Sequence, residues 1–100
     1  MNAELSNSEI CRCIAEHVGP EFERDYGWQK FSVLLNHGPK DVSRFVRNLA
    51  LEILTKPFAS DRLTMLRNVF NDGELNAARP AEDIKAKIRR NCVNIGLIEE

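Results

Sequence analysis

The chain has little net charge and no long hydrophobic run. Its 14 basic and 15 acidic residues leave a net charge of -1, so total charge does not indicate a nucleic-acid or membrane partner. No apolar stretch approaches the roughly 20 residues that a membrane-spanning helix needs. The first residues, Met1 to Ser6, lack the basic and apolar regions of a secretory signal. We therefore expect an intracellular, cytoplasmic protein with no membrane partner.

Cysteine is also scarce. Cys11, Cys13 and Cys92 are too few and too irregularly spaced for a disulfide framework, so we expect reduced thiols that act as small core or surface residues. On a helix, side chains two residues apart point about 200° apart, so Cys11 and Cys13 cannot ligate one ion, even with His17 nearby. The pair also lacks the Cys-x-x-Cys spacing of redox sites. The sequence predicts no metal site.

Motifs for catalysis and cofactor binding are absent too. His17 and His37 lie near expected helix ends, and no serine or cysteine motif accompanies either of them. The five glycines are scattered and form no phosphate-binding loop. The run Asp72-Gly73-Glu74 lacks the repeated acids of a calcium loop and predicts a turn. We expect a non-enzymatic protein without a cofactor.

What the chain does have is helical periodicity, and no segment alternates with period two for long enough to predict a sheet. The sharpest local signal is a capping box, with Ser6 at the N-cap and Glu9 three residues later. The composition is 43% hydrophobic and 29% charged, which is typical of a globular protein. At this length the sequence predicts a single all-α domain over residues 1–100.

About five short helices account for the pattern, packed as a compact bundle. We expect them at residues 7–18, 21–37, 40–56, 60–72 and 80–95. The second of these contains Gly27, which predicts either a kink there or a short helix followed by a longer one. Gly38, before Pro39, predicts a left-handed cap. Four aromatic residues gather in the second segment and are expected in the core: Phe22, Tyr26, Trp28 and Phe31.

The helix at 40–56 has one apolar side and one basic side. Apolar residues recur at helical spacing at Val42, Phe45, Val46, Leu49, Ile53 and Leu54. On the opposite side, Lys40, Arg44 and Arg47 follow one another at i, i+4 and i+7. We expect the apolar side to face the core and the three cations to be free to meet an anionic partner.

A second cluster of positive charge lies in the last helix, at Lys85, Lys87, Arg89 and Arg90. Together with the first cluster it could follow the phosphates of a nucleic acid, with an affinity that falls as the salt concentration rises. The competing interpretation is a solvated face whose cations pair with Glu52, Glu82 or Asp83. Both interpretations are compatible with the sequence.

Short matches to one known family lie at Leu35-Asn36, at Val42-Ser43-Arg44, at Val46 and at Lys56-Pro57. This run resembles the second helix of the nodavirus proteins that suppress RNA silencing by binding double-stranded RNA. The resemblance implies a small all-helical viral protein that dimerises into a four-helix bundle and acts in the cytoplasm of a host cell. It further implies that Arg44 contacts RNA, with Lys40 and Arg47 beside it. Gly38-Pro39 interrupts a helix that is continuous in the family.

Two functions from different classes are therefore expected as alternatives. In the first, the protein binds duplex RNA through the basic face of helix 40–56, alone or as a homodimer, and recognises phosphates and duplex shape rather than sequence. In the second, it is a stoichiometric inhibitor, adaptor or immunity protein of phage or plasmid type that binds a protein target. Its near-neutral charge and short amphipathic helices suit such a surface. A helix-turn-helix regulator is less favoured, because Pro57 stands where that turn usually has glycine.

Overall fold

The computed structural model describes residues 5–57 and 59–99 as six helices and their connections. The helices are α1 (Asn7–Val18), α2 (Glu21–Arg24), α3 (Tyr26–His37), α4 (Lys40–Leu54), α5 (Ala59–Phe70) and α6 (Ala81–Ile95). No strand occurs in this described part of the chain. The predicted all-α bundle is therefore confirmed, with six helices instead of five because the second predicted helix is divided.

The start of α1 follows the sequence prediction. The Ser6 hydroxyl accepts a hydrogen bond from the Glu9 N–H at 3.1 Å, and the Ser6 N–H donates to Glu9 Oε1 at 2.7 Å. These reciprocal bonds satisfy two N–H groups that have no partner within the helix. At the other end, Gly19 turns the chain with a φ of 75°, a conformation that glycine adopts without strain.

The helix predicted at 21–37 is divided at Asp25 rather than at Gly27. Asp25 has an extended backbone, with φ -78° and ψ 135°, which ends α2 and begins α3. Its Oδ1 accepts a hydrogen bond from the Gly27 N–H at 2.8 Å, so Asp25 is the N-cap of α3. The alternative of a short helix followed by a longer one is confirmed.

Gly27 lies inside the first turn of α3, where it permits close packing against α5. A Cβ atom at this position would lie 2.4 Å from the carbonyl oxygen of Arg67. Atoms do not approach this closely, so any larger residue would force the two helices apart. A residue that indicated a kink in the sequence is a packing residue in the structure.

The remaining helix boundaries differ from the predictions by one or two residues, as is usual for helix ends. α4 and α5 each end two residues earlier than predicted, and α6 begins one residue later. Gly38 is extended, with φ -78° and ψ 173°, so the predicted left-handed cap is wrong. The reason is Pro39, because the residue before a proline is driven toward extended backbone. Phe58, in the predicted linker between α4 and α5, lies outside the described residues.

One connected cluster of buried apolar side chains forms the core. The ring of Trp28 lies 5.5 Å from those of Phe22 and Phe31, and Phe31 lies 5.4 Å from Phe70, measured between centroids. The expectation of a core position is confirmed for Trp28 and Phe31, and Phe22 packs at the edge of the core. It is wrong for Tyr26, which is 47% exposed on the solvent side of α3.

The three cysteines are free thiols, as predicted. Cys92 is buried in the core, and burial raises the pKa of its thiol to about 11. Cys11 is half-buried, and burial raises its pKa as well. Within residues 5–57 and 59–99, no group of three or more His, Cys, Asp or Glu side chains could hold a metal ion.

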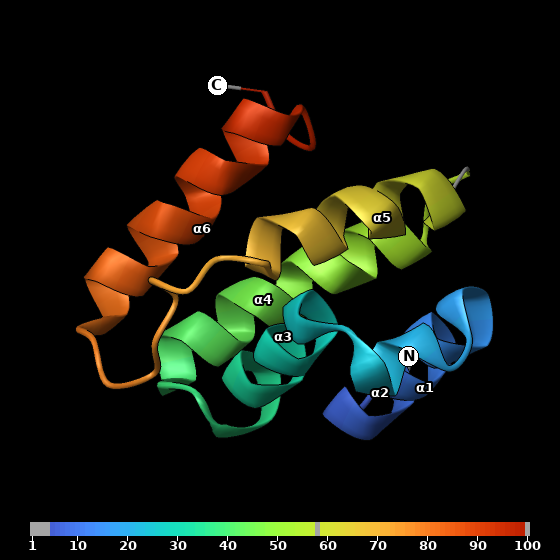
Figure 1. Ribbon diagram of the computed structural model, residues 1–100, viewed down its shortest axis with the longest axis horizontal. Helices are drawn as coiled ribbons and strands as arrows, with labels where there is room; N and C mark the ends of the chain where they lie inside the picture. The colour runs from blue at the N-terminus through green and yellow to red at the C-terminus, as the bar shows by residue number, and fades with distance from the viewer. Residues whose placement is uncertain (1–4, 58, 100) are drawn as a thin grey trace.

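Figure 1 shows α1 and α2 at one end of the molecule and α6 at the other, with α3, α4 and α5 between them. α4 contacts α1, α3, α5 and α6, so four neighbours cover its apolar side. Its opposite side is exposed. The chain between α5 and α6 has no regular structure, but it buries Leu75 completely, which the sequence did not indicate.

Candidate nucleic-acid interface

A groove lies between the first turn of α1 and the exposed side of α4. It has a volume of about 370 Å³ and is lined by Asn7, Lys40, Ser43, Arg44, Arg47 and Asn48. Half of these residues are the cations that the sequence placed on one side of the helix, and none is an acid. We refer to these six residues as the α4 groove. The structure thus adds three neutral hydrogen-bonding side chains to the cations predicted from the sequence.

Helical geometry explains why Lys40 and Arg44 form the outer wall of the α4 groove. Val42, Val46 and Leu49 are buried against neighbouring helices, so the side chains on the opposite side of α4 project into solvent. Lys40 and Arg44 lie there, one turn apart, and both are exposed. Neither side chain has a hydrogen bond or an ion pair with any residue in the described part of the chain. These two cations are therefore available to a ligand.

The inner wall is held in place by hydrogen bonds to the end of α3. The Ser43 hydroxyl donates to the Leu35 carbonyl at 2.6 Å, and Asn7 Nδ2 donates to the same oxygen at 3.3 Å. These bonds join the first turns of α1 and α4 to the last turn of α3. Tertiary contacts thus fix the positions of Asn7 and Ser43. The residues next to them in the sequence do not indicate these positions.

Arg47 has a structural role in this wall. Its Nη1 donates to Asn7 Oδ1 at 2.9 Å, and its Nη2 donates to the Leu5 carbonyl. The side chain is half-buried, whereas the sequence predicted that all three cations would be free. That prediction is wrong for Arg47, because the segment that begins α1 packs beside it. Arg47 lines the α4 groove, and its guanidinium positions the chain before α1.

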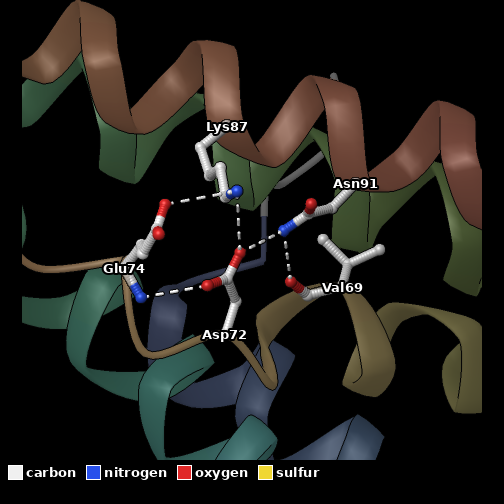
Figure 2. Close-up of polar contacts among 5 residues, drawn as sticks. All are labelled: Val69, Asp72, Glu74, Lys87 and Asn91. Atoms are coloured by element: carbon white, nitrogen blue, oxygen red, sulfur yellow. Dashed lines mark hydrogen bonds and ion pairs between the residues drawn. The ribbon is translucent and has the colours of Figure 1, made fainter.

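The second predicted cluster is divided by the structure, and Lys87 belongs to a different arrangement from the others. Figure 2 shows its ammonium group between two acids of the α5–α6 connection, 3.7 Å from Asp72 Oδ2 and 3.3 Å from Glu74 Oε1. Asn91 on the next turn of α6 donates to the Val69 carbonyl at 3.1 Å and to Asp72 Oδ2 at 2.9 Å. Lys87 and Asn91 therefore attach this connection to α6.

Asp72 is at the centre of this network, and its pKa lies below the ordinary value. Partial burial is the largest single effect and raises the pKa. The hydrogen bonds from Asn91 and from the Glu74 N–H, together with the charge of Lys87, outweigh it. The ionised carboxylate is therefore the form that stabilises the fold.

The other three cations of α6 lie on its outer side. Lys85 Nζ pairs with Glu82 Oε2 at 3.4 Å, as the competing solvated-face interpretation expected for that acid. The Arg89 guanidinium lies over the ring of Phe45 on α4, 5.6 Å from its centroid. Arg90 is exposed, and its guanidinium has no hydrogen bond or ion pair within residues 5–57 and 59–99. The seven cations selected from the sequence thus fall into three separate environments.

A further polar hollow of about 360 Å³ contains groups suited to acid–base chemistry, among them His17, Asp25, Ser60 and Arg67. Asp25 Oδ2 accepts a hydrogen bond from Arg67 Nη1 at 2.8 Å, which joins the start of α3 to α5. Among the described residues, His17 and Ser60 are not hydrogen-bonded to each other, so the hollow does not contain a paired nucleophile and base.

No protein-family model matches this chain, and no curated protein or solved structure shows significant similarity to it. No helix in residues 5–57 and 59–99 is long and apolar enough to cross a membrane. The chemistry of the surface is therefore the feature of this protein that bears on its function.

Proposed function

We propose that this protein binds the phosphate backbone of double-stranded RNA through the α4 groove and catalyses no reaction. The observation that supports this proposal is the composition of the groove, which combines three cations with three neutral polar side chains and has no acid. Phosphate oxygens accept hydrogen bonds from all of these groups, and cations that neutralise phosphates release bound counterions. A polyanion is the class of ligand that this lining suits.

The spacing of the two unpaired cations also supports a backbone ligand. Lys40 and Arg44 are four residues apart, which is about 6 Å along the axis of a helix. Both are long, flexible side chains, so each can contact a separate phosphate of one strand. Arg47 lies in the same groove and holds its wall through hydrogen bonds to Asn7 and Leu5.

The surroundings of the α4 groove favour a duplex over a single strand. Proteins that bind single strands stack the bases on exposed aromatic rings beside basic residues. Among the described residues, the exposed large hydrophobic side chains are Tyr26 and Val33, and both lie on α3. Phe45 on α4 is half-buried and carries the Arg89 guanidinium over its ring. A ligand in the α4 groove would therefore be bound through its backbone and shape, as duplex RNA is.

The resemblance to the nodavirus silencing suppressors agrees with this placement, because Arg44, the residue matched to an RNA contact, is exposed in the α4 groove. The same resemblance implies a homodimer, which would present two such grooves to one duplex. Sedimentation velocity with and without RNA measures that stoichiometry.

The proposal is tested with the double variant Lys40→Glu, Arg44→Glu and an RNA duplex of about 20 base pairs. We expect duplex binding that is tighter than binding to either single strand, and a loss of at least about tenfold in duplex affinity in the variant. For Lys40→Ala, Arg44→Ala the slope of log K against log salt should become shallower by about 2, one for each lost phosphate contact. Fluorescence anisotropy at several salt concentrations measures the duplex preference, the loss of affinity and the change in slope.

A matched control reverses two charges elsewhere, with Arg24→Glu and Arg79→Glu. Both arginines are exposed and lie outside the α4 groove, and neither side chain has a hydrogen bond or ion pair in the described part of the chain. This control carries the same net charge as the test variant and should retain most of the affinity. If no duplex binds at low salt, or if both variants lose affinity equally, the α4 groove is not a nucleic-acid site.

A further inference from the structure

A second groove, on the outer side of α6, has a different chemistry from the α4 groove. It has a volume of about 640 Å³, and three cations of α6 contribute to its wall: Lys85, Arg89 and Arg90. Its lining also includes apolar side chains, among them Val93 and Ile98. The acids Glu82 and Glu99 lie along it as well. We refer to this site as the α6 groove.

Two arginines of the α6 groove have donors to spare. Arg89 stacks over Phe45, and a guanidinium that stacks through its face keeps its N–H groups directed outward in the plane. Such a guanidinium is already oriented, so it loses little conformational entropy when it binds a carboxylate through two parallel hydrogen bonds. Arg90 is exposed and unpaired within the described residues. By contrast, Lys85 is already paired with Glu82 at 3.4 Å.

The rest of the lining argues against a nucleic acid in the α6 groove. Glu82 and Glu99 give the lining a mixed charge, which does not match a ligand that carries a negative charge at every step of its backbone. Val93 and Ile98 offer apolar surface that a phosphate backbone would leave unused. Arginines beside an apolar surface are instead typical of the centre of protein–protein interfaces.

We propose that the α6 groove binds a segment of another protein, an amphipathic helix whose carboxylates meet Arg89 and Arg90 and whose aliphatic side chains pack on Val93 and Ile98. Charge complementarity and the apolar part of the lining both select this partner. Helix-in-groove binding of this kind uses apolar anchors spaced by one turn. The site is separate from the α4 groove, so the protein could hold RNA and a protein partner at the same time.

The experiment uses the full chain and a display library of random peptides about 16 residues long, the length of roughly four helical turns. We expect the selected peptides to combine acidic residues with aliphatic ones at helical spacing. For a selected peptide, Arg89→Glu, Arg90→Glu should lower the affinity at least about tenfold. Lys40→Glu, Arg44→Glu should leave it nearly unchanged. Circular dichroism checks that each variant remains helical.

A measurement on the unmodified chain supports the result independently of any variant. In ¹⁵N NMR spectra, the selected peptide should shift the Nε signals of Arg89 and Arg90 and the amide signals of Val93 and Ile98. The proposal is overturned if no peptide is enriched, or if the enriched peptides lack acids. The proposal is also overturned if the peptide shifts the NMR signals of residues outside the α6 groove. It is overturned as well if duplex RNA shifts the signals of the α6 groove residues. Failure of RNA to bind the α4 groove would leave this inference unaffected.

Discussion

Gly27 shows how the environment of one residue reverses its apparent meaning. In an exposed helix interior a glycine costs about 1 kcal/mol relative to alanine, so its presence in α3 looks unfavourable. Here the missing side chain lets α3 approach α5, since a Cβ would lie 2.4 Å from the Arg67 carbonyl oxygen. The nearest obstacle is backbone, which cannot rotate away as a flexible side chain could. Close packing therefore outweighs helix propensity at this position.

We predict that Gly27→Ala lowers the free energy of unfolding by about 1 to 3 kcal/mol, because α3 and α5 must move apart. Urea unfolding, followed by circular dichroism, measures the loss. Gly73→Ala is the matched control, because a Cβ at Gly73 would meet nothing within 4 Å. It should change stability by no more than about 0.5 kcal/mol. A Gly27→Ala variant as stable as the control would show that the two backbones are not in close contact.

At the scale of single elements, α1 and α4 illustrate how much a helix carries in its own sequence. The capping box of α1 involves residues only three apart, so it was predictable and it formed. The apolar side of α4 was predictable for the same reason, since periodicity is a local property. The surroundings of its basic side were not, because the chain that reaches Arg47 comes from Leu5 and Asn7, about forty residues earlier.

We predict that Ser6→Ala lowers the free energy of unfolding by about 1 kcal/mol, because the Glu9 N–H loses its acceptor at the start of α1. Ser8→Ala is a useful control in the same turn. Ser8 is exposed and alanine favours helix, so this change should be neutral or slightly stabilising. Relative to the original protein, the urea midpoint should therefore fall in Ser6→Ala and stay the same or rise slightly in Ser8→Ala. Equal midpoints would mean that the cap contributes nothing to the fold.

At the scale of the whole molecule, two aspartates join segments that are far apart in the sequence. Asp25 pairs with Arg67 and so links α3 to α5, and Asp72 links the α5–α6 connection to α6. The pKa of Asp25 is lowered, as is that of Asp72. For Asp25, burial is the largest single effect and raises the pKa, but the hydrogen bonds from Arg67 and from the Gly27 N–H together outweigh it and lower the pKa. Both carboxylates therefore favour the folded chain when ionised.

We predict that stability falls in acid because of these two groups. Each has a folded pKa below its unfolded value of about 3.9, so its contribution is complete above that pH and is lost as the pH falls through the folded pKa. Urea unfolding at a series of pH values from about 7 to about 2 measures this dependence. Asp25→Asn should lower the free energy of unfolding by about 1 to 3 kcal/mol at neutral pH. It should also make the acid limb, the part of the curve where the free energy of unfolding falls with decreasing pH, less steep.

Asp61→Asn is the control for this series, because Asp61 is exposed and its carboxylate has no hydrogen bond or ion pair in the described part of the chain. It removes the same charge, so it should leave the acid limb about as steep as in the original protein. An Asp25→Asn variant with an unchanged acid limb would exclude the Asp25–Arg67 pair as a source of acid sensitivity.

The sequence by itself determined the helical class, most of the helix limits, the cap of α1 and the apolar side of α4. These features depend on the spacing of residues a few positions apart, so they do not require knowledge of how the helices pack. Only the tertiary structure decided which cations are available. It tied Arg47 to the start of α1, placed Lys87 between two acids and stacked Arg89 on Phe45. The reason is physical: burial and ion pairing depend on which helices lie side by side, and no local pattern specifies that.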